Sequence, residues 1–351
     1  MNSTERRYDI DWLRVIAIAL LLIYHVAIVF QPWGTLVGFI TSSESMESIW
    51  IPMAMLNVWR IPILFFVSGM GVCFAMKKRT WKQLIAERSW RILLPLVFGM
   101  LAIVPIHIML TQMYYSQDIS YFAHRAHLWF LANIFAYVLI LLPIFYYLKH
   151  KQNGKLRQKL NQLFSSPFTV IIVMSPFVVE AEIMAPEHFE MYSMTWHGFF
   201  LGLLAFLFGY LFIYSGDGFW RMVSKWRWLF FVMAFSLYLT RLVVYELMGA
   251  PDYLLSIESN LWVFSVFGFG YKYLNRPGKT LQYLSQAAYP IYIIHMVFLY
   301  LGCVWILPMD FPVSAKLLLV TLITFIGSYA FYELVIRRVG VVGVLFGLKR
   351  K

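Results

Sequence analysis

The stretch "YDIDWLRVIAIALLLIYH", Tyr8 to His25, decides the fold of this chain. A membrane-spanning helix needs about 20 mostly apolar residues, and this stretch is long and apolar enough to form one. It nevertheless carries Asp11, Arg14 and His25. Ionisable side chains inside a bilayer cost free energy and usually mark a functional cavity. The stretch therefore predicts a membrane helix with a functional polar face.

The composition predicts an all-α polytopic membrane protein. The 351 residues are 61% hydrophobic and 19% aromatic, and only 13% are charged. A soluble domain is nearer a quarter charged. The aromatic excess is typical of a protein with two membrane–water interfaces. Cys73 and Cys303 both fall inside apolar runs, so we expect reduced packing residues and no disulfide.

Apolar runs of sufficient length predict a bundle of about ten transmembrane helices. They are Ile10–Phe30, Ile51–Met76, Ile92–Met113, Leu128–Leu148, Pro167–Met184, Trp196–Tyr214, Trp228–Met248, Tyr253–Leu274, Tyr283–Ile306 and Phe311–Ile336. The fifth run is the weakest, because Pro176, Glu180 and Glu182 interrupt it. The first run is too long for the apolar core of a cleavable signal peptide, and no small-residue cleavage site follows it.

The loops between these runs alternate in charge. Most of the 29 Lys and Arg residues lie in one alternate set, which ends with Lys349, Arg350 and Lys351. The opposite loops hold only Arg125 and Lys316 beside several acidic residues. The positive-inside rule then places both termini in the cytoplasm. The net charge of +12 reflects this topology, so we expect no nucleic-acid partner.

The three polar residues of the first run share one face of the predicted helix. Arg14 and His25 are 11 residues apart. At roughly 100° per residue they return to within about 20° of each other, and roughly 16 Å separates them along the axis. Asp11 lies one turn from Arg14 on the same stripe. A lone buried histidine is often a packing residue, but the stripe favours a functional site.

Other candidate residues allow two interpretations each. Ser68 and Gly69 permit close approach by a ligand or simply by another helix. The basic residues that follow could bind lipid headgroups or the phosphates of a cofactor, and they are Lys77, Lys78, Arg79, Arg88 and Arg91. Arg60 and Arg241 lie within spans, either at a functional cavity or in structural ion pairs.

The later spans add further polar residues. His295 lies near mid-membrane in the ninth run, one turn above Tyr292. Glu333 lies near the inner end of the tenth run, where it could pair with a cytoplasmic base. For His127 and Trp129, an aromatic belt at the membrane interface and acceptor binding are equally open interpretations.

With these segments in order, the chain resembles the acyltransferase family 3 of membrane proteins. The resemblance rests on "DWLRVIAIALLLIYH", "FFVSGM", "ERSWRILLP", "HLWFL", "YPIYIIH" and "YELVIRR", which together cover most of the membrane domain. "HLWFL" is similar to the branch that includes osmoregulated-glucan succinyltransferases. Ala132 and Asn133 stand where another branch would have paired acids.

The resemblance implies transfer of an acyl group, acetyl or succinyl, from cytoplasmic acyl-CoA to a hydroxyl of a carbohydrate or envelope glycan. Acetyl-CoA is the first expected donor, and no metal is expected. Residues matching Arg14 and His25 are essential in such families. We expect His25 to be the general base, although a nucleophilic histidine that first accepts the acyl group stays open. Asp11 would orient Arg14.

The expected sites follow from this interpretation. The donor would be bound by Arg14, Ser68, Gly69, Lys77, Lys78, Arg79, Arg88 and Arg91. The acceptor would be bound by Arg60, His127, Trp129, Tyr292 and His295. We expect one integral-membrane domain over 1–351, without an added extracytoplasmic domain, in the cell (inner) membrane of a bacterium. A secondary transporter or flippase, with Asp, Arg and His as a substrate or proton relay, is the alternative.

Overall fold

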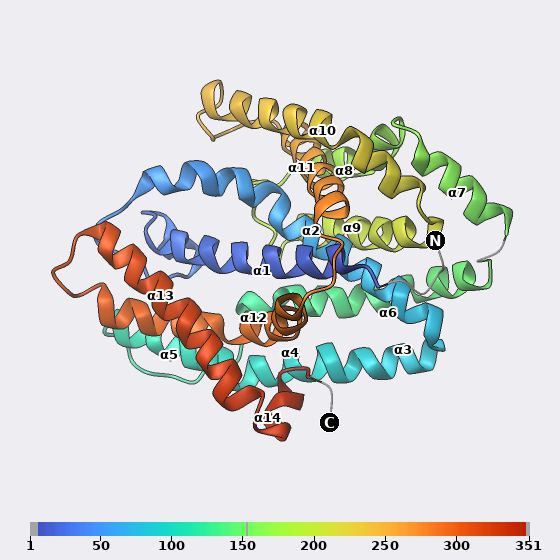
Figure 1. Cartoon of the computed structure of the whole chain (residues 1–351). Coiled ribbons are helices and arrows are strands. Elements are labelled where there is room, and N and C mark those ends of the chain that lie inside the picture. The colour runs from blue at the N-terminus through green and yellow to red at the C-terminus, as the bar shows by residue number, and fades with distance from the viewer. Residues whose placement is uncertain (1–5, 152–153, 349–351) are drawn as a thin grey trace. The chain divides into compact units, whose positions relative to one another are not determined.

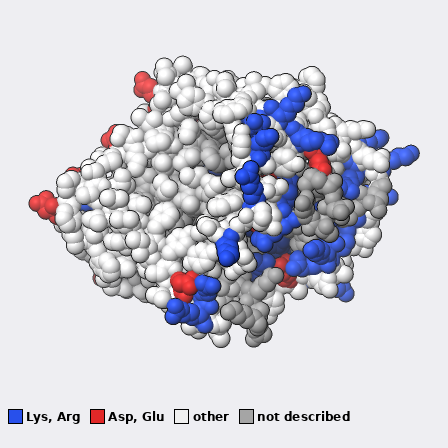
Figure 2. Space-filling model, in the orientation of Figure 1, with Lys and Arg blue, Asp and Glu red and all other residues white. Residues whose placement is uncertain are grey.

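The computed structural model describes residues 6–151 and 154–348. Lys349, Arg350 and Lys351, counted above in the last basic segment, lie outside the described residues. Every regular element within the described residues is a helix (Figure 1), which confirms the all-α fold class. On the face drawn in Figure 2, most of the surface belongs to residues without charge, as contact with lipid requires.

The structure contains long helices joined by short helical turns. The α-helices are α1 (Tyr8–Val29), α2 (Trp50–Lys78), α3 (Trp81–Arg88), α4 (Leu94–Phe98), α5 (Val104–Tyr114), α6 (Trp129–His150), α7 (Lys155–Ser165), α8 (Thr169–Met184), α9 (Trp196–Ser215), α10 (Gly218–Val243), α11 (Asp252–Tyr273), α12 (Lys279–Ile306), α13 (Val313–Phe331) and α14 (Gly340–Leu345). The 3-10 helices are η1 (Gly34–Val37), η2 (Glu47–Ile49) and η5 (Ala126–Leu128). The π-helices are η3 (Ser89–Leu93), η4 (Gly99–Ile103) and η6 (Tyr332–Ile336).

Eight helices of the described residues are long and apolar enough to cross a membrane. They are Tyr8–Val29, Glu47–Lys78, Trp81–Tyr114, Ala126–His150, Trp196–Ser215, Gly218–Val243, Lys279–Ile306 and Val313–Ile336. The prediction of ten spans is therefore corrected to eight, or to nine if α7 and α8 together form one broken span. The axes of α7 and α8 are bent by 92°. The bend follows Ser166, whose extended backbone (ψ 142°) is what a residue before proline prefers.

The remaining predicted span is α11. It is a helix of 22 residues, so its length suffices. It is nevertheless more polar than a spanning helix, because Ser256, Glu258, Ser259 and Asn260 occupy its first half. All four side chains are buried within the protein. These polar side chains of α11 are therefore packed inside the protein and do not meet lipid.

The described chain divides into two compact units, each built from three separate segments. Unit 1 consists of the segment that ends at Ala17, Ala54–Ala86 and Asn133–Leu281. Unit 2 consists of Ile18–Met53, Glu87–Ala132 and the segment that begins at Gln282. One integral-membrane domain over 1–351 stays a prediction.

Glycines allow two helices of unit 1 to pack closely. A Cβ atom on Gly69 of α2 would lie 1.9 Å from the carbonyl oxygen of Phe206 in α9. A Cβ atom on Gly209 of α9 would lie 2.0 Å from the carbonyl oxygen of Phe66 in α2. No side chain fits at either position, because real Cβ atoms do not approach within 3.0 Å. The two helices therefore meet through small residues, as membrane helices commonly do.

A proline in α2 adds a second constraint in unit 1. Pro62 has no N–H, so the carbonyl group of Val58 loses the donor that a regular helix would provide. Two side chains supply donors instead. The Tyr192 hydroxyl donates to the Val58 oxygen at 3.0 Å, and the Ser259 hydroxyl donates to it at 2.6 Å. The hydrogen bond that α2 lacks at Val58 is thus replaced by two bonds that connect α2 to other segments of unit 1.

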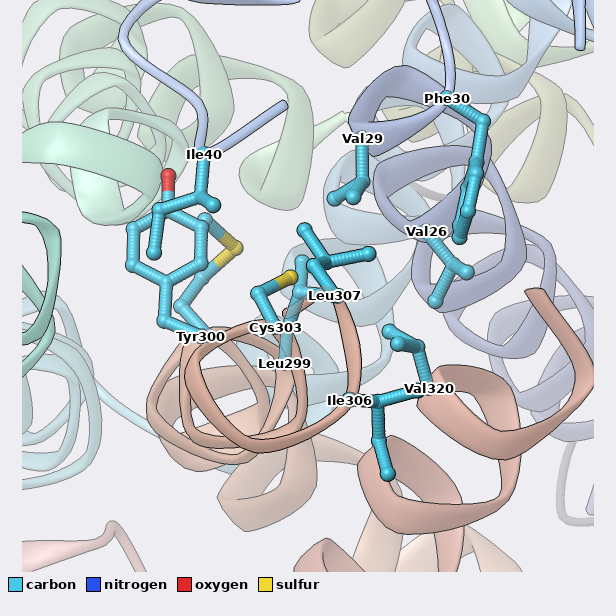
Figure 3. Close-up of a cluster of buried hydrophobic side chains, with 11 residues drawn as sticks. Val26, Val29, Phe30, Ile40, Leu299, Tyr300, Cys303, Ile306, Leu307 and Val320 are labelled. Atoms are coloured by element: carbon cyan, nitrogen blue, oxygen red, sulfur yellow. The ribbon is translucent and has the colours of Figure 1, made fainter. Parts of the chain in front are cut away.

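Unit 2 is built around a buried apolar cluster that joins α1, α12 and α13 (Figure 3). Its members are Val26, Val29, Phe30, Ile40, Met296, Leu299, Tyr300, Cys303, Ile306, Leu307 and Val320. In a membrane such contacts stabilise through close van der Waals packing. Cys303 in this cluster and Cys73 in unit 1 are both free and buried, as the sequence predicts.

The loop after α1 folds back on the end of that helix. The carbonyl groups of Val29 and Phe30 have no donor within the helix, because helix ends leave such groups unsatisfied. The N–H of Ser42 donates to the Val29 oxygen at 2.8 Å, and the N–H of Met46 donates to the Phe30 oxygen at 2.9 Å. The loop is thereby held against α1, and the Phe39 ring lies 5.4 Å from the His25 ring.

Candidate functional site

The polar centre of unit 2 is a contact between His25 of α1 and His295 of α12. His25 Nδ1 lies 2.9 Å from His295 Nε2, and the two ring planes differ by 9°. His295 Nδ1 lies 2.7 Å from the carbonyl oxygen of Tyr292. His295 is fully buried and His25 is part-buried. The structure thus places His295, which the sequence assigns to acceptor binding, directly against the expected base.

The hydrogen bonds assign the tautomers of this pair when both rings are neutral. A carbonyl oxygen only accepts, so the Tyr292 contact places the proton of His295 on Nδ1. Its Nε2 must then accept, so His25 donates through Nδ1–H. The lone pair of His25 consequently lies on Nε2. This chain of hydrogen bonds holds the His25 ring against His295 with its lone pair on Nε2.

Two further histidines extend the pair into a group that we call the histidine cluster, His25, His107, His127 and His295. The His127 ring lies 5.3 Å from the His295 ring, and the His107 ring lies 5.5 Å from the His127 ring. His107 comes from α5 and is buried, at 4% exposure. Sequence reasoning missed His107, although a histidine in the apolar run "VPIHIML" gives the same signal as His295.

Helix α12 fixes the position of His127 as well as that of His295. His127 Nε2 lies 3.0 Å from the carbonyl oxygen of Ile293, and the Tyr292 hydroxyl donates to the carbonyl oxygen of His127. Trp129 is buried at the start of α6 and contacts the ring of Phe130. A buried Trp129 does not fit an exposed aromatic belt. The structure therefore brings His127, Tyr292 and His295 together, with Trp129 in the same unit, and their role in acceptor binding stays a prediction.

The other end of α1 lies in unit 1, where Arg14 and Asp11 form an ion pair. Arg14 Nη1 lies 3.6 Å from Asp11 Oδ1, and Arg6 donates to Asp11 Oδ2 at 2.8 Å. A Cβ atom on Gly71 of α2 would lie 3.9 Å from Arg14 Nη2, so a small residue borders the guanidinium. The expected orienting role of Asp11 depends on this contact.

The other residues of unit 1 that are predicted to bind acyl-CoA divide into an exposed group and a packed group. Lys77 and Lys78 are exposed at the end of α2, and the carbonyl oxygen of Arg79 accepts a hydrogen bond from Lys149 at 2.6 Å. Ser68 donates to the Leu64 oxygen of its own helix at 2.7 Å. Gly69 lies against the backbone of α9, as described above. For Gly69 the interpretation as a helix-packing residue is therefore the one that its contacts support.

Arg88 and Arg91, which are also predicted to bind acyl-CoA, lie in unit 2. Arg88 directly precedes η3, and Arg91 lies within it. Arg91 donates to Glu87 Oε1 at 3.1 Å, and Arg88 Nε lies 3.9 Å from Glu87 Oε2. The π-turn that follows Arg88 adds a residue to one helical turn, and such turns are frequent at functional sites. The arginines thus stand on a locally widened helix.

Arg241 in unit 1 has a structural environment. Its guanidinium donates to Glu258 at 3.0 and 3.1 Å, to Glu190 at 2.7 Å and to the Ala54 carbonyl oxygen at 2.8 Å. Arg241 and Glu258 are both fully buried. Arg60, expected to bind the acceptor, is buried in unit 1 and donates to Asn57 at 3.0 Å.

The last candidate residue, Glu333, forms the ion pair that the sequence suggests. Arg337 donates to Glu333 at 2.7 Å, and the Tyr283 hydroxyl donates to the same carboxylate at 3.1 Å. In residues 6–151 and 154–348, no three His, Cys, Asp or Glu side chains are arranged to hold a metal ion. The histidine cluster itself offers imidazole nitrogens, which can accept and donate protons.

A family model described as an acyltransferase domain, that of acyltransferase family 3, matches residues 7–333. No curated protein and no solved structure matches the chain. The matched residues include the whole histidine cluster and Arg14. This match confirms the family inferred from the ordered motifs, whereas the succinyltransferase branch stays a prediction. The chain belongs to acyltransferase family 3, and its reaction class is acyl transfer in a membrane protein.

Proposed function

We propose that this acyltransferase moves an acyl group from acyl-CoA to a hydroxyl of a carbohydrate or envelope glycan, in the inner membrane of a bacterium. The hydrogen-bonded pair of His25 and His295 is the observation that carries the proposal. A hydroxyl attacks a thioester only slowly unless a base removes its proton, and a histidine is the usual base. Acetyl-CoA is the first donor to test, and succinyl-CoA is the second.

The proposed step is a direct attack of the acceptor hydroxyl on the thioester carbonyl carbon. His25 Nε2 takes the hydroxyl proton while the carbon–oxygen bond forms and the carbon–sulfur bond breaks. The same nitrogen then gives the proton to the CoA thiolate, so that CoA leaves as a thiol. General base catalysis of this kind contributes about 10²- to 10⁴-fold to the rate.

His295 acts on this step through His25. It accepts the Nδ1–H of His25 and donates its own Nδ1–H to the Tyr292 carbonyl oxygen. These bonds hold the His25 ring in the tautomer that leaves Nε2 basic. They also stabilise the positive charge that His25 gains when it takes the proton, which is the role of the third group in a hydrolase triad. We therefore assign His295 as a positioning residue.

Arg14 is our candidate for binding the phosphates of CoA. Arginine binds phosphate through parallel N–H bonds, and the ion pair with Asp11 orients its guanidinium. Arg14 precedes His25 by 11 residues on the same helix, which corresponds to roughly 16 Å along the axis of α1. An extended pantetheine arm suits that length. The exposed Lys77 and Lys78 would assist, together with Arg79, Arg88 and Arg91.

The alternative in which His25 first accepts the acyl group uses the same nitrogen, Nε2. It differs in one observable way, because an acyl-enzyme releases one equivalent of CoA before any acceptor is added. We favour direct transfer, since the hydrogen bonds of His25 and His295 supply one proton-accepting nitrogen for one hydroxyl proton.

The test is acetyl-CoA turnover by the purified protein in detergent, for the wild type and for His25→Ala. We expect slow release of free CoA by the wild type and a loss of about 10²- to 10⁴-fold in the variant. His150→Ala is the matched control, because His150 is exposed and bonds only to the Tyr146 carbonyl oxygen of its own helix turn in the contacts described.

Each outcome of this test is informative. A stoichiometric burst of CoA in the wild type would favour the acyl-histidine route over direct transfer. Full activity of a folded His25→Ala protein would exclude His25 as the base. If the protein releases CoA from neither acetyl-CoA nor succinyl-CoA, the result would favour the transporter or flippase, because a transporter does not cleave a thioester.

A further inference from the structure

Two ring nitrogens of the histidine cluster are buried without a hydrogen-bond partner among the described residues. They are Nδ1 of His107 and Nδ1 of His127. A buried polar atom left unsatisfied costs about 1–3 kcal/mol. Native structures therefore fill such positions with a ligand group or an ordered water. Two of them on neighbouring rings indicate a place where an external polar group binds.

The hydrogen bonds of His127 define what that group must offer. His127 Nε2 lies 3.0 Å from the carbonyl oxygen of Ile293, which can only accept. The proton of neutral His127 is therefore on Nε2, and Nδ1 carries a lone pair that requires a donor. His107, in the tautomer with its proton on Nδ1, supplies a donor beside it. A group that donates to one ring and accepts from the other satisfies both.

A hydroxyl group meets this requirement with a single oxygen atom. An ammonium group can donate but cannot accept, and a carboxylate can accept but cannot donate. The rings of His107 and His127 lie 5.5 Å apart. One oxygen that makes two hydrogen bonds of about 2.8 Å can link rings at that separation. Water shares this chemistry, so an experiment must separate a bound water from a hydroxyl of the substrate.

We propose that His107 and His127 bind a second, non-reacting hydroxyl of the acceptor, so that the enzyme selects polyols over simple alcohols. This inference rests on the proposed function, in which the reacting hydroxyl meets His25. The His127 ring lies 5.3 Å from the His295 ring, and the His295 ring lies 5.2 Å from the His25 ring. Both positions therefore belong to one cluster of rings, and a sugar or polyol carries the second hydroxyl that a simple alcohol lacks.

The surroundings of His107 favour a built site over a loosely packed side chain. The His107 ring meets the Tyr300 ring edge-on at 5.4 Å, and the Tyr300 hydroxyl donates to the Gly38 carbonyl oxygen at 3.0 Å. Tyr292, whose hydroxyl bonds the backbone of His127, contacts the His127 ring at 5.8 Å. Both imidazoles are thus held by groups that are themselves fixed by hydrogen bonds.

The test compares glycerol with ethanol as acceptors of the acetyl group of acetyl-CoA. The measured quantity is the ratio of kcat/KM for glycerol to kcat/KM for ethanol, from the acylated products. We expect the wild type to prefer glycerol, and His107→Leu to lower the ratio about 3- to 10-fold, the range of one lost hydrogen bond. His150→Leu, outside the histidine cluster, should leave the ratio unchanged.

Two further variants keep the test sharp if His107→Leu folds poorly. The amide of asparagine reaches the position of Nδ1, and the amide of glutamine reaches that of Nε2. His107→Asn should therefore keep more of the glycerol preference than His107→Gln. An equal effect of both variants on glycerol and ethanol transfer would overturn the proposal, because it would show a structural role only.

Three further outcomes would contradict the proposed second hydroxyl site. A wild-type enzyme that uses glycerol no better than ethanol, or uses neither, overturns the second hydroxyl site. A change in acetyl-CoA hydrolysis by His107→Leu without a change in the ratio overturns it too and indicates a bound water. If the wild type releases no CoA at all, the proposed function fails first and this inference fails with it.

Discussion

The Arg241 network of unit 1 and the histidine cluster of unit 2 both contain buried polar side chains, but their hydrogen bonds differ. In unit 1, the guanidinium of Arg241 donates from all three nitrogens to Glu258, Glu190 and the Ala54 carbonyl oxygen. In unit 2, the hydrogen bonds described for the histidine cluster involve no carboxylate, and two ring nitrogens have no partner there.

We interpret this difference as that between a structural network and the proposed site. A buried charge that is paired with carboxylates serves the fold, and removing its partner mainly costs stability. A neutral imidazole with an unsatisfied buried nitrogen can bind a hydroxyl, which removes the cost of leaving that nitrogen unpaired. We therefore expect variants in the Arg241 network to change folding, and variants in the histidine cluster to change rate and selectivity.

The largest expected effect follows from breaking the Arg241 network. Arg241→Met leaves the Glu258 carboxylate buried without its counter-ion, and losing one partner of a buried pair costs about 3–5 kcal/mol. The measurement is the unfolding of the detergent-solubilised protein by heat or denaturant. Arg125→Met, which removes an exposed arginine, is the control.

The double variant Arg241→Met with Glu258→Gln sharpens this prediction. It should recover part of the lost stability, because no uncompensated carboxylate stays buried. Unchanged unfolding of Arg241→Met together with loss of acyl transfer would break the comparison, since Arg241 would then belong to a reactive site.

A smaller effect is expected at His295, where the loss should appear in rate. The side-chain oxygen of glutamine reaches the position of Nε2, which accepts from His25, whereas asparagine is too short. We expect His295→Asn to lower the rate of CoA release about 10- to 100-fold, as expected for a lost hydrogen bond to a charged group. His295→Gln should retain more of the rate. Equal rates in the two variants would show that His295 only fills space.

Much of this fold could be predicted from the sequence, because the length of an apolar run decides whether a helix can cross a bilayer. The segment Asp252–Tyr273 shows where that rule ends. Its polar residues, such as Glu258, are covered by the protein, and Glu258 is paired with Arg241 of another helix. The predicted fifth span, Pro167–Met184, likewise became the second arm of a bent pair at Ser166.

The site could be predicted only in part, for a related reason. The face shared by Asp11, Arg14 and His25 follows from helical periodicity, which is local. The partner of His25 is not local, because His295 lies 270 residues further along the chain. His107 was missed since a lone histidine in an apolar run does not reveal its neighbours. Gly69 illustrates the converse, because a glycine that admits a ligand and one that admits a helix look alike in a sequence.

The smallest expected effects concern the Val58 carbonyl group of unit 1. It accepts from both Tyr192 and Ser259 in place of the N–H that Pro62 lacks. Side-chain hydrogen bonds in a membrane protein contribute about 0.6 kcal/mol on average. We therefore expect Tyr192→Phe and Ser259→Ala each to cost about that much in unfolding free energy, with Ser236→Ala, an exposed serine, as the control.

The double variant should cost more than the sum of the two single variants, because only then does the buried Val58 oxygen lose both side-chain donors, at about 1–3 kcal/mol. Pro62→Ala offers an independent check, since alanine returns the N–H to the helix. In that background both single variants should cost less than in the wild type. Strictly additive unfolding costs, or equal costs with Pro62 and with alanine at that position, would contradict this prediction. They would mean that the Tyr192 and Ser259 side chains stabilise unit 1 by packing. The hydrogen bonds of the Val58 oxygen would then not distinguish this part of unit 1 from the histidine cluster.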